Sequence, residues 1–450
     1  MQTDILKKIN SPNDLKPLNI EELNCYSKEL SSFIDDTVSN IGGHYSSPLG
    51  VVDLSIALHY VYNSPFDKLI WDVGHQAYAH KIITGRRESF NTLRKKDGIS
   101  GFLKRSESEH DIFGAGHAST SISAALGVAH ARDLKEDDFQ VLSIIGDGSM
   151  TGGLAYEGIN NLGYHRTQLT VVLNDNSMSI SKSVGALSGY LTKIITNPTY
   201  NKIRKDIWDL SGKLPVGSKL LRKFLKKTQT GIKNYITPGS LFEDLGLRYI
   251  GPVDGHNIQE LINVFKSVKE MNGPVLVHVL TNKGKGNELA EKDSVKYYSV
   301  SGESSNNSNK VSFSKVFGDS MCDIADDDKD IMCITAAMEK GTGMSEFVDR
   351  YPKNYKDVGI AEEHAVTYGA GLACENIIPV VALYSTFAQR AYDQFFHDVS
   401  LQNLPMVVCL DRAGVVGPDG PTHHGVFDIS IFRSLPNIVI SCPANGNELR

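Results

Sequence analysis

Two short polar stretches suit a divalent cation bound together with phosphate oxygens. Gly146-Asp147-Gly148-Ser149 is followed twenty-five residues later by Asn174-Asp175-Asn176. Magnesium prefers hard oxygen ligands in octahedral geometry and often bridges a carboxylate to phosphate oxygens. Asp147 can supply the carboxylate, Asn176 an uncharged amide oxygen, and Met178 a backbone carbonyl oxygen. The pattern therefore predicts a site for Mg²⁺ and a diphosphate.

The residues around these stretches predict one β-α-β unit. Residues 141–145 and 169–173 are apolar runs with the length of buried strands, and residues 150–161 between them have a helical pattern. Both polar stretches then follow the carboxyl ends of strands, where open α/β sheets bind ligands, and the helix start offers unpaired N–H groups. Either stretch alone is typical of an ordinary turn. The two together, at this spacing, favour a ligand site.

Further motifs lie at residues 42–44, 72–77, 116–121, 251–256, 361–365, 384–390, 411–414 and 420–425. Together with the β-α-β unit, which matches the signature of thiamine-diphosphate enzymes, they make the chain resemble the 1-deoxy-D-xylulose-5-phosphate synthase family. The resemblance covers essentially the whole chain. It implies a transferase of the transketolase type that uses thiamine diphosphate and Mg²⁺ to condense pyruvate with D-glyceraldehyde 3-phosphate, releasing carbon dioxide. The product would enter isoprenoid (terpenoid), thiamine and pyridoxal biosynthesis.

The resemblance also implies catalytic roles. Glu362 matches the carboxyl group that bonds N1′ of the aminopyrimidine and so favours the tautomer that removes the C2 proton of the thiazolium. Glu363, where the family usually has Gln, competes for this role, and the register of the motif selects Glu362. His44 and His423 are candidates for proton transfer, because an ordinary imidazole titrates near neutrality.

The residues expected to contact the cofactor come from both halves of the chain. Tyr384 and Phe387 match positions that pack on the pyrimidine ring. Without the matching motif, these two aromatic residues would indicate only packing in the core. The other residues expected at the cofactor match contacts to the diphosphate, the thiazolium or the metal. The full set is His75, Gly116, His117, Ala118, Gly148, Ser149, Asn176, Asn287, Glu362, Tyr384 and Phe387.

Four further positions bear on the acceptor and on departures from the family. Arg412 suits the acceptor's phosphate through a bidentate guanidinium contact. Asp419, in a Gly-Pro-Asp-Gly turn, is either a functional acid or a turn former. Asn287 stands where the family has Tyr, and Tyr298 stands where it has His. Tyrosine is a poor proton shuttle at pH 7, because its ordinary pKa is about 10.

These departures leave alternatives open. One is a synthase-like carboligase with an altered acceptor, and another is a catalytically silent, truncated paralogue that still binds the cofactor. A dinucleotide-binding dehydrogenase is weaker, because Gly114-Ala115-Gly116-His117-Ala118-Ser119 lacks the third glycine of that fingerprint.

The fold class we expect is α/β, with two thiamine-diphosphate-binding domains, each a mainly parallel sheet flanked by helices. With 450 residues, 41% of them hydrophobic, the chain is too long for one ordinary domain. Residues 1–300 would bind the diphosphate and Mg²⁺ and carry a basic helical excursion at about 184–240. Residues 301–312 have a linker composition, and residues 313–450 would bind the pyrimidine. The strands expected beyond the first unit are 275–280, 331–335, 380–383, 406–410 and 438–441.

Composition limits the partners. The net charge of -6 argues against nucleic acid, and the basic stretch at 202–233 reads as a solvated amphipathic helix. The six cysteines show no C-x-x-C spacing, and no apolar run reaches the length of a membrane span. We therefore expect a cytoplasmic protein with no membrane partner, and the resemblance implies a homodimer. The last residues open a helix that does not develop, so we expect the pyrimidine domain to be cut off and the family's third domain to be absent.

Overall fold

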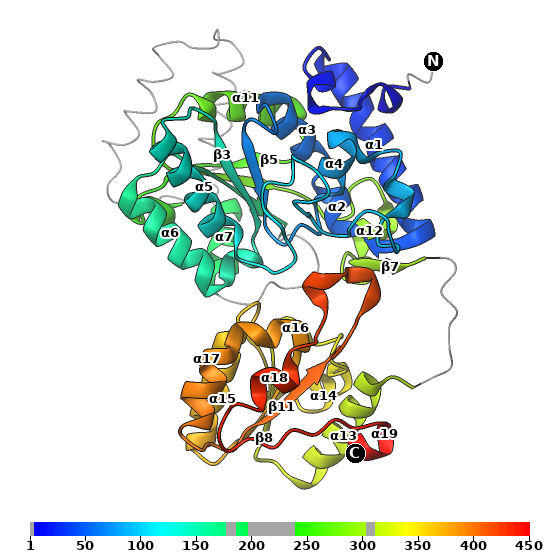
Figure 1. Ribbon diagram of the computed structural model, residues 1–450, viewed down its shortest axis with the longest axis vertical. Coiled ribbons are helices and arrows are strands. Elements are labelled where there is room, and N and C mark those ends of the chain that lie inside the picture. The colour runs from blue at the N-terminus through cyan, green and yellow to red at the C-terminus, as the bar shows by residue number, and fades with distance from the viewer. Residues whose placement is uncertain (1–3, 177–185, 197–238, 303–310) are drawn as a thin grey trace.

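The computed structural model describes residues 4–176, 186–196, 239–302 and 311–450, which form two α/β domains (Figure 1). The expected ligand Met178 and the basic stretch at 202–233 lie outside the described residues. So does most of the excursion expected at 184–240.

The first domain is built around a five-stranded sheet in the order β2-β3-β4-β6-β5, in which all neighbouring strands run parallel. An antiparallel pair, β1 and β7, lies outside this sheet. The strands are β1 (Gly42–His44), β2 (Lys68–Trp71), β3 (Val141–Gly146), β4 (Thr170–Asp175), β5 (Arg248–Asp254), β6 (Val275–Leu280) and β7 (Ser299–Ser301). The α-helices are α1 (Ile20–Ile41), α2 (Ser46–Gly50), α3 (Val52–Val61), α4 (Tyr78–Lys81), α5 (Ser121–Lys135), α6 (Gly153–His165), α7 (Ala186–Thr196), α10 (Ser240–Asp244), α11 (Ile258–Lys269) and α12 (Glu288–Lys292).

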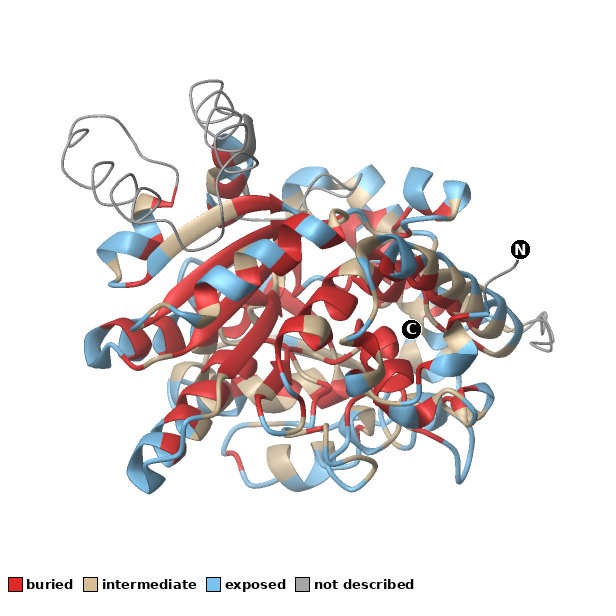
Figure 2. Ribbon diagram, turned by 90° about the horizontal axis from the view of Figure 1, so that it is seen from above, coloured by how far each residue is buried: buried red, intermediate tan, exposed pale blue. Residues whose placement is uncertain are grey.

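The central strands of this sheet are buried on both faces because helices cover both sides (Figure 2). Leu142 and Ile144 of β3 pack into a core with α1, α3 and α11. Val141 and Ile145 of the same strand pack into a second core with α5, α6 and α7. The side chains of a strand alternate between its two faces, so one continuous apolar run serves both cores.

The second domain repeats the scheme with a four-stranded parallel sheet in the order β11-β10-β8-β9. Ile334 and Val381 face a core that includes α15, whereas Cys333 and Val380 face a core with α13 and α14. The strands are β8 (Ile331–Thr335), β9 (Tyr355–Asp357), β10 (Ile378–Tyr384) and β11 (Val407–Asp411). The α-helices are α13 (Phe313–Asp327), α14 (Ser345–Arg350), α15 (Glu362–Cys374), α16 (Ser385–Ala388), α17 (Tyr392–Gln394), α18 (Asp428–Phe432) and α19 (Gly446–Leu449).

The α/β class and the two parallel-sheet domains confirm the fold expected from the sequence. One expected strand is wrong: residues 438–441 are not in a strand, and Val439 is 96% exposed. A strand needs a hydrogen-bonded neighbour, and β11 pairs only with β10 in the described sheet. Among the described helices, none is both long enough and apolar enough to cross a membrane.

Two glycines test how tightly the helices of the first domain pack. A Cβ on Gly163 of α6 would lie 1.7 Å from the backbone oxygen of Leu245, whereas one on Gly127 of α5 would meet nothing within 4 Å. Gly163→Ala should therefore lower the free energy of unfolding by about 2 kcal/mol or more, because the helix must move away. Gly127→Ala should raise it by roughly 0.5–1 kcal/mol, since alanine favours a helix over glycine. Urea denaturation followed by circular dichroism measures both, and equal effects would contradict this packing.

Candidate active site

The two polar stretches lie side by side at the carboxyl ends of neighbouring strands. Gly146 of β3 is paired with Asn174 of β4, and the Asp147 backbone N–H donates to the Asn174 carbonyl at 3.1 Å. The Asn174 side chain donates to Gln76 at 3.1 Å and accepts from the hydroxyl of Thr281 at 2.6 Å. Asp147 is only 7% exposed, and this pairing brings it to the strand end that Asn176 follows.

Asp72 fixes the turn that contains Gly116 and His117. Its two carboxylate oxygens accept the backbone N–H groups of Ser119 at 2.9 Å and Ser121 at 3.0 Å. The carboxylate thus binds the start of α5, where helix N–H groups have no partner within the helix. The motif at 72–77 therefore supports the motif at 116–121 as well as carrying His75.

His44 and His75 are half-buried neighbours whose Nδ1 atoms are buried without a hydrogen-bond partner among the described residues. Their ring centroids lie 5.5 Å apart. Burial lowers the pKa of His44 well below its ordinary value and that of His75 to about 3. Such unpaired atoms are costly in a protein interior, so they indicate a site that a polar ligand completes.

The expectation that the two candidate proton-transfer histidines titrate near neutrality needs correction. Burial is the largest influence on both, and it lowers the pKa of His423 to about 4, although Asp419 opposes the change. In this structure both His44 and His423 are neutral at pH 7. They can donate or accept hydrogen bonds without carrying charge.

Lys283 adds a cation to the first-domain site that the sequence motifs did not identify. Burial lowers the pKa of Lys283, while the charge of Asp147 opposes that shift, so the ammonium group lies within electrostatic range of the proposed metal ligand. Lys283 also lowers the pKa of His75. The signal in the sequence was the run Lys283-Gly284-Lys285-Gly286, whose glycines let the backbone turn sharply.

In the second domain, Glu362 is the buried acid at the start of α15. Only 3% of it is exposed, and Arg390 Nη1 lies 3.5 Å from its Oε2. Burial raises the pKa of Glu362 to about 6, against the opposing charge of Arg390. Glu363 is only half-buried. The two adjacent acids thus differ in burial, and this difference favours Glu362 over Glu363 as the acid proposed to bond the aminopyrimidine.

The aromatic residues expected at the pyrimidine lie together near Glu362. The rings of Tyr384 and Phe387 are stacked with centroids 5.8 Å apart, and Phe387 meets the edge of His117 at 5.1 Å. The Arg412 guanidinium lies over the Tyr384 ring at 4.0 Å. Arg412 is therefore beside the expected pyrimidine wall, held by a cation–π contact.

Polar contacts join the two domains at this point. His117 Nε2 donates to the Thr422 carbonyl at 2.8 Å, and Arg390 Nη2 donates to the Ala118 carbonyl at 2.6 Å. Gly116 lies so close to Thr422 that a Cβ on the glycine would be 2.6 Å from it. The turn at 116–118 is thus covered directly by the second domain.

A second group of contacts closes the same interface. Asp419 forms an ion pair with Arg94 at 2.7 Å, and the His423 ring stacks on Phe102 at 4.6 Å. Asp419 therefore links the domains, a role that neither of the sequence interpretations contained. Arg94 and Phe102 belong to no recognised motif, so only the tertiary structure identifies them.

The Asn287 side chain is hydrogen-bonded to protein atoms through both its oxygen and its nitrogen. Its Oδ1 accepts the backbone N–H groups of Leu289 and Ala290 at the start of α12, and its Nδ2 donates to Tyr45 Oη at 2.8 Å and to Asp35 at 3.3 Å. Both ends of the amide are committed to protein atoms. This capping role argues against the expected cofactor contact at Asn287.

Tyr298 occupies space beside His44 and His75. Its ring centroid lies 5.6 Å from that of His44 and 5.8 Å from that of His75. Although 41% of the residue is exposed, desolvation by the surrounding protein raises the pKa of its hydroxyl to about 12, and Asp419 adds to the rise. The hydroxyl stays protonated at pH 7 and is available as a hydrogen-bond donor.

These residues fit a magnesium diphosphate attached to a polar heterocycle. A Cβ on Gly146 would meet nothing within 4 Å, so there is open space directly above the polar strand ends. Lys283 would supply positive charge for phosphate, and Asp147 and Asn176 would supply oxygen ligands. The described residues contain no group of three or more His, Cys, Asp or Glu side chains arranged for a metal. A magnesium ion that keeps phosphate and water ligands does not require one.

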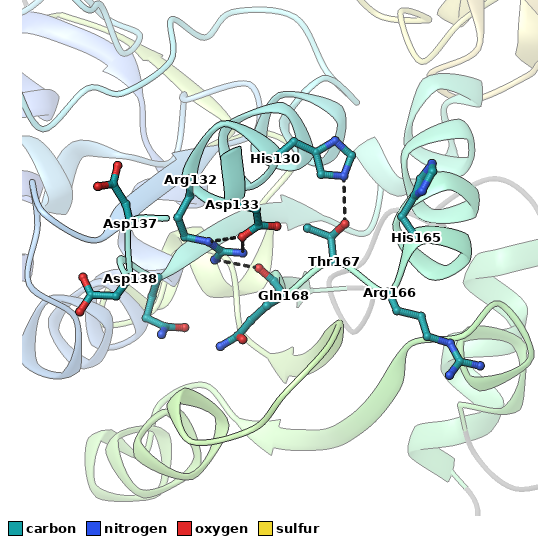
Figure 3. A pocket seen from close by; sticks show the side chains of 10 residues that line it. His130, Arg132, Asp133, Asp137, Asp138, His165, Arg166, Thr167 and Gln168 are labelled. Carbon is teal, nitrogen blue, oxygen red and sulfur yellow. Dashed lines mark hydrogen bonds and ion pairs between the residues drawn. The ribbon is translucent and has the colours of Figure 1, made fainter. Parts of the chain in front are cut away.

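A cavity of about 560 Å³ lies elsewhere, at the amino ends of β3 and β4 (Figure 3). Arg132 on its wall is paired with Asp133 at 2.7 Å and donates to the Gln168 carbonyl at 3.1 Å. Because ligands of open α/β sheets bind at the carboxyl ends, this cavity is on the wrong edge to be the active site.

Comparisons with known proteins match both domains of the chain to known families. A family model described as 1-deoxy-D-xylulose-5-phosphate synthase matches residues 6–281, and one described as transketolase, pyrimidine binding domain, matches residues 309–450. The 1-deoxy-D-xylulose-5-phosphate synthase of Caldanaerobacter subterraneus is 53% identical over 455 residues, covering 99% of this chain and 72% of that protein. The protein of the same name from Halothermothrix orenii is 52% identical over 453 residues, covering 99% and 71%. A solved transketolase from Campylobacter jejuni is 15% identical with a TM-score of 0.44, covering 99% of this chain and 76% of that one.

Two parallel-sheet domains that meet over a polar strand edge and a buried glutamate define a thiamine-diphosphate-dependent transferase of the transketolase type. More narrowly, the chain belongs to the 1-deoxy-D-xylulose-5-phosphate synthase family. It spans about seven tenths of the length of the relatives named here.

The raised pKa of Glu362 makes a prediction about stability. In the folded protein this carboxyl titrates at about 6, above its ordinary value of 4.5. The folded state therefore binds the proton more tightly, and the resulting stability is lost as the pH rises through about 6. Glu362→Gln removes the buried charge and should stabilise the cofactor-free protein by about 2 kcal/mol at pH 8, and by less as the pH falls toward 4.5.

Thermal unfolding of both proteins between pH 5 and pH 8 measures this difference. Glu363→Gln is the matched control, since that neighbour is only half-buried. A gain from Glu362→Gln that does not change with pH would contradict the burial of an ionised carboxylate.

Proposed function

We propose that the chain is a 1-deoxy-D-xylulose-5-phosphate synthase, which condenses pyruvate with D-glyceraldehyde 3-phosphate. One observation carries this proposal furthest: Arg390 contacts both Glu362 and the Ala118 carbonyl, which places the buried acid of one domain against the polar turn of the other. The two expected halves of the cofactor site are thereby joined in one place. The names of the related proteins support the same reaction.

Thiamine diphosphate, when bound, would supply a nucleophilic carbon that can add to the pyruvate carbonyl and a cationic ring that can take up the electron pair left when carbon dioxide departs. Asp147 and Asn176 would hold Mg²⁺, and Lys283 would face the diphosphate. Glu362, with a pKa of about 6, can hold a proton on its carboxyl oxygen and share it with a ring nitrogen. In the overall reaction pyruvate loses its carboxylate as carbon dioxide, a new carbon–carbon bond forms to the aldehyde, and one proton is taken up.

Side chains on the opposite wall suit the substrates. The neutral imidazoles of His44 and His423 can donate hydrogen bonds to carbonyl and hydroxyl oxygens without repelling a cation. Arg412 and Arg94 supply guanidinium groups for the acceptor's phosphate, and Asp419 already orients Arg94. We propose that the ion pair between Asp419 and Arg94 presets the phosphate subsite.

The family likeness favours Mg²⁺ as the metal and a homodimer as the assembly. The six cysteines form no disulfide with one another, which suits the reducing conditions of the cytoplasm, and we propose that compartment for the protein. Sedimentation velocity of the purified chain tests the assembly.

A second candidate function is a related carboligase with a different aldehyde acceptor. It is favoured by the tyrosine at position 298, because a phenol beside His44 and His75 changes the size and hydrogen bonding of the wall relative to the family's imidazole. Product analysis with several aldehydes would separate the two functions.

The direct test is an assay of the purified chain. With thiamine diphosphate, Mg²⁺, pyruvate and glyceraldehyde 3-phosphate, we expect equal amounts of carbon dioxide and deoxyxylulose phosphate. Glu362→Ala should reduce both by about 100-fold or more, because general acid–base catalysis typically contributes that much. Carbon dioxide without the sugar phosphate would favour the second candidate. Cofactor binding without either product would favour the silent paralogue.

Tyr298 makes a further prediction. Tyr298→Phe deletes the hydroxyl while keeping the ring, and we expect kcat/KM for pyruvate to fall about tenfold, the effect of one lost hydrogen bond. Tyr297→Phe is the control, because that ring packs on Tyr45 with centroids 6.3 Å apart. Equal activity of the Tyr298→Phe variant and the unaltered enzyme would show that the hydroxyl does not contact substrate.

A further inference from the structure

Three polar side chains form a largely buried chain of hydrogen bonds beneath the proposed metal site. Tyr249 Oη lies 2.7 Å from His278 Nδ1, and His278 Nε2 lies 2.7 Å from Asp175 Oδ2. The side chains of His278 and Asp175 are both 0% exposed. The three residues come from three neighbouring strands, β5, β6 and β4.

The chemistry of the partners determines how the protons are arranged. A carboxylate only accepts hydrogen bonds, so His278 must donate to Asp175 from Nε2. The remaining Nδ1 of a neutral imidazole is then an acceptor, and it receives the hydroxyl proton of Tyr249. The hydroxyl thus selects the tautomer that serves Asp175, as outer hydrogen bonds do at metal sites.

Asp175 lies between two residues of the ligand-binding edge. It is the last residue of β4, directly after Asn174 and directly before Asn176. Side chains alternate along a strand, so Asp175 points to the sheet face opposite Asn174. Its carbonyl also accepts the backbone N–H of Thr281 at 2.9 Å. Asp175 therefore attaches the end of β4 to β6 through both its side chain and its backbone.

Tyr249 is itself fixed by packing. Its ring stacks on Phe242 with centroids 6.2 Å apart and planes 5° apart, and a Cβ on Gly239 would lie 2.4 Å from it. Phe242 in turn meets the edge of Tyr190. A ring held in this way keeps its hydroxyl in one direction.

We propose that His278, oriented by Tyr249, is a positioning residue for the divalent cation: it fixes Asp175 and thereby the adjacent ligand Asn176. This inference rests on the proposed function, which makes Asp147 and Asn176 the protein's magnesium ligands. Magnesium requires near-ideal octahedral geometry, so a small displacement of one ligand weakens its binding. Deletion of such an outer contact typically costs 10–100-fold in metal affinity.

Metal binding tests the inference independently of catalysis. Mn²⁺ binding is followed by electron paramagnetic resonance, with Mg²⁺ as competitor and thiamine diphosphate at saturation. We expect Tyr249→Phe to weaken Mn²⁺ binding about 3–10-fold and His278→Gln about 10–100-fold. Tyr62→Phe is the matched control, because its buried hydroxyl donates to the Phe265 carbonyl at 3.4 Å, away from the site, and should leave metal binding unchanged.

The thermal stability of the metal-free proteins separates positioning from structure. If both variants lower the melting temperature and leave Mn²⁺ affinity unchanged, the inference is overturned. If His278→Gln does not fold, the Mn²⁺ affinity of Tyr249→Phe, which lacks only the hydroxyl oxygen, tests the inference. Asp147→Asn tests the underlying site: if it too leaves Mn²⁺ binding intact, the assigned cation site fails, and the inference fails with it. If Asp147→Asn weakens Mn²⁺ binding while Tyr249→Phe and His278→Gln do not, the cation site stands and only the role of His278 is overturned.

Discussion

The guanidinium of Arg390 is the contact on which the assembly of the site depends. It donates to the Ala118 carbonyl of the first domain and lies 3.5 Å from Glu362 of its own domain. Glu362 is almost fully buried, and an isolated carboxylate there would be costly. Its stabilisation therefore depends on the same cation that holds the domains together. One side chain therefore contributes both to the interface and to the electrostatics of the buried acid, whose pKa is raised mainly by burial.

Around this contact, few side chains carry a positive charge. The imidazoles of His44, His75 and His423 are kept neutral by burial, so the positive charge near the strand edge comes from Lys283 and the arginines. Neutral rings can line a site that takes a cation and an anion together without repelling either. The Nδ1 atoms of His44 and His75 have no hydrogen-bond partner among the described residues, and a bound ligand can provide one.

The sequence predicted the parts of the structure that depend on local pattern. Two apolar runs and a helical pattern were enough to place Asp147 and Asn174 at adjacent strand ends, because a β-α-β unit puts them there. The strand expected at 438–441 failed, since an apolar run forms a strand only where a neighbour offers hydrogen bonds. Arg94, Phe102 and the bridging role of Arg390 depend on contacts between distant segments. Likewise, the capping of α12 by Asn287 could not be separated from a cofactor contact by residue type alone.

The contacts of the 116–118 turn with Thr422 and Arg390 join residues of one polypeptide. Both halves of the proposed site therefore belong to the same chain. In the proposed homodimer, an intact chain paired with a defective one would keep its own complete set of these residues. Defects in the site should accordingly be recessive, and two chains defective in different domains should fail to complement each other.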